Sequence, residues 1–583
     1  MVSLSELRDL EIRELAEAAR GWGDISNRAY AARDKVKDDI AKNLDATQEG
    51  LASMAAIARL GRLIRNYQYI HVECGLIQAS LNGLAQELAA PQKRLVQALA
   101  DAASRGFKVH DDGSVSYPAA GEATNGRQPV GDTATGSSGL LGRGLSSAVS
   151  GLNPNPNAAP AQNIANEIAT ALSHAAEVDT QYSTALRRLK AEPGLDVTSA
   201  TWGDVSGDSA AVHRAADDAL KSAIPTGESP TERRQWWEGL SSADRATYMA
   251  LYPETIGNLD GIPATARDEA NRTYLPQLMG KLELQGDEDS RTKLDGLRVI
   301  QDKLNSTSQP PMFLLGIGDE GNGRAIVAYG NPDTSKNVSA YIPGLGTNLD
   351  EDFANNDLKR ARDTAALAQE VNPSSASIVW LGYDAPQSAD VMSAGDAERG
   401  APAYNSFMAG LSATNENSDP HVTAIGHSYG SRTLGAATQQ PGGIPGADDI
   451  ILVGSPATGA DHAEELGVGK EHVWVGAAKN DVVTKLPAPD ELAFGLPGVL
   501  AAYNGLGDDL WFGRDPASEE FGANRFRTDD GPSLFVDAWL DGKLIDPEAH
   551  SNYFDPDKDQ LSAENIAAIV AGEPGKVIPE ARR

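Results

Sequence analysis

After Pro310 the sequence alternates between short apolar runs and longer helical segments. The first two runs, "MFLLGIG" and "RAIVAYG", are joined by the turn "DEGNG", which predicts a hairpin. The later runs are separated by helical or loop segments, as a mostly parallel sheet covered on both faces requires. This part of the chain therefore predicts an α/β fold, whose later strands are "NVSAYIPG", "SIVWLGY", "VTAIGHS", "DIILVGS" and "HVWVGAA".

The strand "VTAIGHS" ends at Ser428, which stands between Gly426 and Gly430 in "GHSYGS". The following stretch, "SRTLGAATQ", has a helical pattern. A strand, a sharp turn and a helix in this order form a nucleophile elbow, in which the glycines leave room for close approach of the backbone. The pattern Gly-x-Ser-x-Gly occurs once in the chain. We therefore predict that Ser428 is a nucleophile rather than one more turn serine.

A serine hydroxyl becomes a good nucleophile when a histidine takes its proton and a carboxylate orients that histidine. The usual chain order after such an elbow is serine, acid, histidine, which leaves His462, His472 and His550 as candidate bases. His472 opens the strand "HVWVGAA", at the wrong edge of the sheet, and His462 leaves no later strand to carry the acid first. We predict His550 as the base and interpret His427, next to the nucleophile, as a packing or supporting residue.

The acid is expected at the carboxyl end of a strand, where α/β sheets place their active-site groups. Asp481 meets this condition, because "HVWVGAA" runs into "KNDVV". Asp461, which follows the preceding strand in "ATGADHAEE", is the alternative. The predicted catalytic set is Ser428, Asp481 and His550.

The oxyanion formed during attack needs two preorganised N–H donors. One is normally the amide of the residue after the nucleophile, here Tyr429. The second is expected from the loop "YIPGLGTNLD", where Gly344 and Gly346 allow the backbone to approach the substrate. Either Leu345 or Gly346 can offer this second N–H, and an ordinary glycine turn is the alternative interpretation.

The second half of the chain resembles the actinobacterial α/β-hydrolases first catalogued as a domain of unknown function and now placed in the abhydrolase group. The resemblance covers residues 225–560 and rests on a helical lead-in and four short motifs. It implies an α/β-hydrolase fold and serine-hydrolase chemistry, with nucleophile, acid and base at Ser428, Asp481 and His550. The quoted segments are "WWEGLSSADRATYMALYPETIGNLDGIPATARDEANR", "IPGLGT", "GHSYGS", "KNDVV" and "AHSNYF".

The first half of the chain has a helical pattern, with apolar residues at steps of three and four such as Met54, Ile57, Leu60 and Ile64. A stretch dense in Gly, Ser, Pro and Asn interrupts it and predicts a linker. We expect an all-α N-terminal region ahead of the hydrolase fold. The predicted parts are helical residues 1–111, a linker at 112–160, a second helical region at 161–222, the hydrolase domain at 223–560, and a C-terminal helix and tail at 561–583.

Composition limits the partners of this 583-residue chain. Its 50 Lys and Arg against 82 Asp and Glu give a formal charge of −32, which disfavours nucleic acid as a partner. Cys74, the single cysteine, excludes an internal disulfide framework. We expect no cofactor and no metal, because "GIGDEGNG" opens a hairpin rather than a helix and "DPDKDQLSAE" lacks the glycine of a calcium loop.

The chain start is charged and amphipathic, without the apolar core of a signal peptide, and no apolar window reaches the length of a membrane span. We expect a protein that is cytoplasmic, or exported without a cleavable signal peptide. The family's helical regions resemble leaderless secretion substrates, but Trp22 is followed directly by Gly23 and departs from their Trp-x-Gly turn. The leading hypothesis is an esterase acting on a small acyl substrate. The competing one uses the hydrolase fold as a scaffold, with self-association or a helical partner bound through residues 1–111.

Overall fold

The computed structural model divides into two compact units, which we call the helical unit and the sheet unit. The helical unit takes in residues within 1–36, 50–224 and 242–251, and the sheet unit takes in 37–49, 225–241 and 252–583. The structure describes residues 2–47, 50–123, 128–139, 144, 154–190, 196–216, 218–306, 309–387, 393–486, 509–532 and 548–583.

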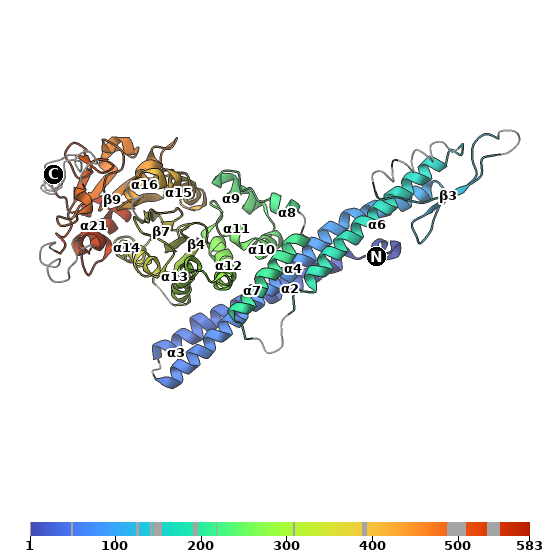
Figure 1. The fold of residues 1–583 in the computed structure, drawn as a ribbon, viewed down its shortest axis with the longest axis horizontal. Helices are drawn as coiled ribbons and strands as arrows, with labels where there is room; N and C mark the ends of the chain where they lie inside the picture. Colours follow the sequence, from blue (N-terminus) through green and yellow to red (C-terminus); the bar gives the residue numbers. More distant parts are fainter. Residues whose placement is uncertain are drawn as a thin grey trace. The chain divides into compact units, whose positions relative to one another are not determined.

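The helical unit is built on α4 (Leu51–Ser104), along which α2 (Ile12–Asp34) and α6 (Ala158–Leu186) lie side by side (Figure 1). Pro91 lies inside α4 rather than ending it. Leu88 and Leu95, one turn on either side, are buried, and their packing offsets the hydrogen bond that the proline cannot donate. The remaining helices are α1 (Leu4–Arg8), η1 (Lys35–Ala41), α3 (Lys42–Thr47), α7 (Ser199–Ala215), α8 (Asp218–Ser222) and α10 (Ser242–Leu251), of which α3 is assigned to the sheet unit and η1 spans the two.

The predicted linker at 112–160 contains packed secondary structure in its described part. Strands β1 (Lys108–Val109), β2 (Val115–Tyr117) and β3 (Asp132–Ala134) form an antiparallel sheet, in which Val115 pairs with Ala134. Both of these side chains are buried, and Gln162 of α6 donates a 2.7 Å hydrogen bond to Thr135 O. Strands of two or three residues carry too few alternating positions to show in a sequence, so composition alone was misleading.

The sheet unit contains an eight-stranded sheet in the order β13-β10-β9-β8-β6-β7-β5-β4. Every pair is parallel except those made by β5, which runs antiparallel to both β4 and β7. This confirms the predicted hairpin and the mostly parallel sheet. The strands are β4 (Met312–Gly318), β5 (Arg324–Tyr329), β6 (Asn337–Ile342), β7 (Ser375–Leu381), β8 (His421–His427), β9 (Asp449–Val453), β10 (Val473–Gly476) and β13 (Asn524–Phe526), with the separate pair β11 (Asp509–Leu510) and β12 (Gly513–Arg514).

Helices cover both faces of this sheet (Figure 1). Alternate residues of β8 point to opposite faces, so Ile425 packs in a core with α12 (Ala264–Gln285), α13 (Glu288–Asn305), α14 (Leu358–Val371) and α21 (Gln560–Val570). Ala424 packs on the other face with α15 (Gly395–Thr414) and α16 (Gly430–Thr438). The other short helices are α9 (Pro230–Gly239), α11 (Pro253–Ile256), η2 (Phe353–Asp357), η4 (Ala463–Leu466), η5 (Lys470–His472), η6 (Val483–Lys485), α20 (Glu548–Ser551), η7 (Asn552–Phe554) and η8 (Pro574–Lys576).

Two predicted boundaries can be compared with the structure. Residues 561–583, predicted as a C-terminal helix and tail, include most of α21, whose Ile566, Ile569 and Val570 are buried in the sheet core. Residues 242–251, predicted within the hydrolase domain, form α10, which packs against α4 in the helical unit. Among the helices that the structure describes, none combines the length and apolar character of a membrane span.

Candidate active site

Ser428 occupies a strained turn between β8 and α16, near the centre of the sheet. Its φ of 54° lies in the left-handed region, which among the described non-glycine residues is shared only with Ala457. The N–H of Ser428 donates a 3.0 Å hydrogen bond to Val453 O at the end of the neighbouring strand β9. A residue with a side chain persists in this conformation only when its surroundings fix it, and such strain is typical of functional positions. The local geometry is that of a nucleophile elbow.

The two glycines of the elbow are required by close backbone contacts. A Cβ atom at Gly430 would lie 2.2 Å from Ile342 O, and one at Gly426 would lie 2.7 Å from Ser431 Cα. Neither distance is possible for a real side chain, so the turn excludes any other residue at both positions. These contacts explain why the motif has glycine there.

Asp481 and His550 meet although 69 positions separate them in the chain. Asp481 lies after β10, and His550 lies on α20, beyond β13. The Nδ1 atom of His550 is 3.0 Å from Asp481 Oδ2 and 3.1 Å from Oδ1. A carboxylate bound to Nδ1 places the imidazole proton there and leaves Nε2 as the acceptor that a general base needs.

Asp481 is almost fully buried, yet its carboxylate is well supplied with donors. Tyr553 donates its hydroxyl to Oδ2 at 2.7 Å, and the N–H of Val483 donates to Oδ1 at 2.9 Å. Burial raises the pKa of Asp481, but the His550 imidazole and these hydrogen bonds outweigh it, so the pKa lies below its ordinary value. Tyr553 in turn accepts a 2.9 Å hydrogen bond from Ala478 N–H. Asp481 is therefore held as a charged acceptor for His550.

Gly454 shows how closely this pair approaches the elbow. It follows Val453, the residue that binds Ser428 N–H, and has a φ of 56°. A Cβ atom there would lie 2.8 Å from His550 Nδ1 and 3.1 Å from Asp481 Oδ2. Among the described hydrogen bonds of His550, the side-chain ones join its Nδ1 to Asp481, and none reaches Ser428 Oγ.

The predicted oxyanion donors differ in the structure. No described hydrogen bond uses the N–H of Tyr429 or of Leu345. Gly344, just before Leu345, lies against the nucleophile, because a Cβ atom there would be 3.1 Å from Ser428 Oγ. Gly346, the alternative second donor, does not fit that role in the structure, because its N–H already donates a 2.9 Å hydrogen bond to Pro386 O.

The two histidines that were set aside and the alternative acid, Asp461, lie elsewhere. His472 binds Asp449 Oδ1 at 3.1 Å, at the amino ends of the strands and opposite the elbow. His462 contacts Glu520 O, and Asp461 is exposed. None of these three residues has a described contact with Ser428.

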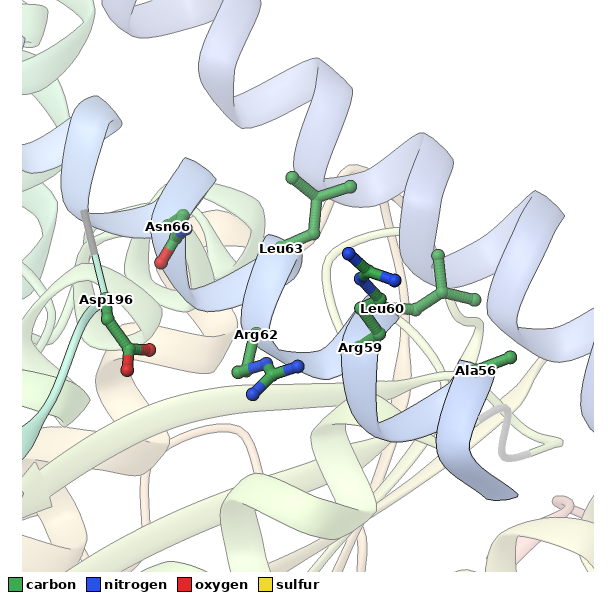
Figure 2. Close-up of a pocket in the computed structure, with 7 residues that line it drawn as sticks. All are labelled: Ala56, Arg59, Leu60, Arg62, Leu63, Asn66 and Asp196. Atoms are coloured by element: carbon green, nitrogen blue, oxygen red, sulfur yellow. The ribbon is translucent and has the colours of Figure 1, made fainter. Parts of the chain in front are cut away.

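A cavity of about 620 Å³ lies in the helical unit. Figure 2 shows side chains of α4 around it, with Asp196 from the segment before α7. Its described lining contains no serine, cysteine or histidine, and its one carboxylate is that of Asp196. The lining residues are Ala56, Arg59, Leu60, Arg62, Leu63, Asn66 and Asp196.

Comparison with known proteins agrees with this geometry. A family model described as alpha/beta hydrolase matches residues 319–490, which include the elbow and Asp481. An uncharacterized protein of Mycobacterium bovis is 37% identical over 213 residues, which are 35% of this chain and 78% of the relative. The chain belongs to the α/β-hydrolase family.

A longer match covers more of this α/β-hydrolase. An uncharacterized protein of Mycobacterium tuberculosis is 31% identical over 385 residues, 60% of this chain. The match spans 56% of that relative's own length. No solved structure matches the chain. The comparisons thus support the predicted family and its actinobacterial setting, while the relatives' names state no substrate.

Proposed function

We propose that the protein is a serine hydrolase that cleaves carboxylic esters through an acyl-enzyme on Ser428. The observation that carries this proposal is the Asp481–His550 pair beside a serine with a φ of 54°. His550 Nε2 takes the proton of Ser428, and the oxygen attacks the acyl carbon. The protonated imidazole then gives that proton to the departing alcohol oxygen, leaving an ester on Ser428. His550 next takes a proton from water, the hydroxide attacks the acyl carbon, and the acid is released as Ser428 regains its proton.

The oxyanion of each tetrahedral intermediate is bound in this proposal by the N–H groups of Tyr429 and Leu345. Neither N–H is used in a described hydrogen bond. Tyr429 directly follows Ser428, and Leu345 directly follows Gly344, which lies against the Ser428 side chain. Loss of one such donor typically lowers turnover about a hundred- to a thousandfold. Esters are favoured as substrates, with thioesters and amides as the alternatives.

The test compares the wild type with Ser428→Ala on p-nitrophenyl esters and with a fluorophosphonate probe. Ser428→Ala is expected to lower kcat by about 10⁴- to 10⁶-fold, as is usual when a catalytic serine is lost, and to abolish labelling. Ser339→Ala is a matched control, because it removes a buried serine hydroxyl bound to Ser377 elsewhere in the same sheet. Hydrolysis that survives in Ser428→Ala, or a folded wild type that the probe does not label, contradicts the proposal.

A further inference from the structure

His427 contacts His550 in two ways. The rings stack with centroids 4.7 Å apart and planes 28° from parallel, and His427 Nε2 lies 2.8 Å from the backbone oxygen of His550. His427 is 5% exposed and is enclosed further by Phe554, whose ring meets it edge-on at 5.9 Å. Among the described residues, the imidazole therefore has one hydrogen-bond partner and one stacked ring, and it has little contact with solvent.

The acceptor determines the tautomer of His427. A carbonyl oxygen can only accept, so Nε2 carries the proton and donates it to His550 O. Burial lowers the pKa of His427 well below its ordinary value, and the nearby His550 and Arg360 lower it further. The ring of His427 is thus a neutral donor near neutral pH.

The contacts of His427 restrain the ring and the backbone of His550. His550 lies on a helix of four residues, and Asp481 holds only one edge of its ring. A hydrogen bond at Nδ1 fixes the direction of the ring edge but allows the ring plane to tilt. Stacking against His427 opposes that tilt, and the bond to His550 O fixes the backbone that carries the ring. Because His427 precedes Ser428 directly, one peptide unit links the nucleophile to the residue that holds the base.

We propose that His427 is a positioning residue that fixes the ring plane and backbone of His550 relative to Ser428. This inference rests on the proposed function and deepens it. The role differs from packing alone, because it requires both the donated hydrogen bond and the flat surface of the ring. Displacing a catalytic group by about 1 Å can cost on the order of a hundredfold in rate, so its effect should appear in turnover rather than in binding.

The experiment uses the full chain with His427→Phe, which keeps a flat ring and loses the donor, and His427→Gln, whose Nε2 can still reach the carbonyl. We expect His427→Phe to lower kcat and the rate of fluorophosphonate labelling by about 10- to 100-fold with KM changed less than about twofold. His427→Gln should recover at least a third of the kcat that is lost. Tyr404→Phe is the control, because it also deletes one buried side-chain donor to a backbone oxygen, that of Ala340, and should leave kcat unchanged.

A folded His427→Phe with kcat within about twofold of wild type overturns the inference, as does an equal loss in Tyr404→Phe. A wild type that the probe does not label would instead overturn the proposed function. If His427→Phe does not fold, ¹⁵N NMR of the wild-type histidines decides the question. A neutral His427 with its proton on Nε2 between about pH 5 and 8 supports the inference, and a proton on Nδ1 overturns it.

Discussion

The two units each bury a carboxyl group, and they treat it in opposite ways. In the sheet unit, Asp481 is 1% exposed and receives hydrogen bonds from His550, Tyr553 and Val483. In the helical unit, Glu73 of α4 is 5% exposed, and neither of its carboxylate oxygens has a hydrogen-bond partner among the described residues. Burial alone therefore does not distinguish a catalytic acid from a structural one.

The difference appears in the charge that each group can carry. Donors and the His550 imidazole keep the pKa of Asp481 below its ordinary value despite burial. Burial raises the pKa of Glu73 to about 8, and the nearby Asp208 and Asp204 raise it further. A buried carboxylate supplied with donors is ready to orient a base at neutral pH, whereas one without donors is mostly protonated there. The number of donors around a buried acid is thus the more informative sign of function.

Of the changes that test this comparison of buried acids, Asp481→Asn is expected to have the largest effect, because it removes the negative charge of Asp481. The amide can present its NH₂ to His550 and favour the wrong tautomer, so kcat for p-nitrophenyl ester hydrolysis should fall about 10⁴-fold with KM little changed. Asp461→Asn, at the alternative acid, should leave kcat unchanged. A larger loss in Asp461→Asn than in Asp481→Asn would assign the acid to the other residue.

Tyr553→Phe sharpens the comparison by removing one donor from Asp481 while retaining the ring. A hydrogen bond to a charged acceptor is worth about 1.5–3 kcal/mol, so kcat should fall at least about tenfold through a less firmly oriented His550. The pKa of Asp481 should also rise, because the hydroxyl is one of the groups that lower it. Measured kcat across pH 4–8 would show this as a steeper loss on the acid side. An unchanged profile would mean that His550 and the Val483 N–H hold the carboxylate without the Tyr553 hydroxyl.

The parts of the candidate site that the sequence predicted depend either on neighbours in the chain or on the order of the strands. The elbow is local, since Gly426, Ser428 and Gly430 lie within five positions and their spacing carries the geometry. Asp481 and His550 were proposed from strand order, and the structure brings them together. Gly346 was wrong as a donor, because the direction of its N–H is set by Pro386, a contact that no motif records.

Other features depend on packing between distant segments. The support of Asp481 by Tyr553 was missed, although Tyr553 stands three positions after His550, a spacing that places side chains on one side of a helical turn. The eight-stranded sheet of the sheet unit was predicted because its buried strands are apolar runs in the sequence. The small sheet of β1, β2 and β3 was not, and neither was the packing of α10 with the helical unit, since amphipathic periodicity does not state which partner covers an apolar face.

Glu73→Gln tests the other side of the comparison and should alter stability without altering activity. The folded pKa of Glu73 is raised, so its contribution to stability is fully present below about pH 4.5 and is lost as pH rises through about 8. The wild type should therefore lose stability between pH 6 and 9, and Glu73→Gln should lose less, by about 1–3 kcal/mol at pH 9. Calorimetric unfolding at both pH values measures this, with the exposed Glu14→Gln as control. Parallel pH dependence in wild type and Glu73→Gln would show that Glu73 is ionised in the folded state.

Removing the helical unit is expected to have the smallest effect on activity, because it contains none of the proposed catalytic residues. All proposed catalytic and oxyanion residues lie between 345 and 550, so a chain of residues 225–583 should hydrolyse a small soluble ester within about threefold of the full-length kcat/KM.

This chain keeps α10, whose Tyr248 and Leu251 are buried in the helical unit and would become exposed. It should consequently aggregate more readily, and Tyr248→Ser with Leu251→Ser should reduce that tendency without changing kcat. Self-association that depends on residues 1–111 should be lost from it, as sedimentation velocity against the full-length protein would show. A monodisperse, folded but inactive 225–583 would break the comparison, because the helical unit would then be needed to hold Ser428, Asp481 and His550 in their working geometry.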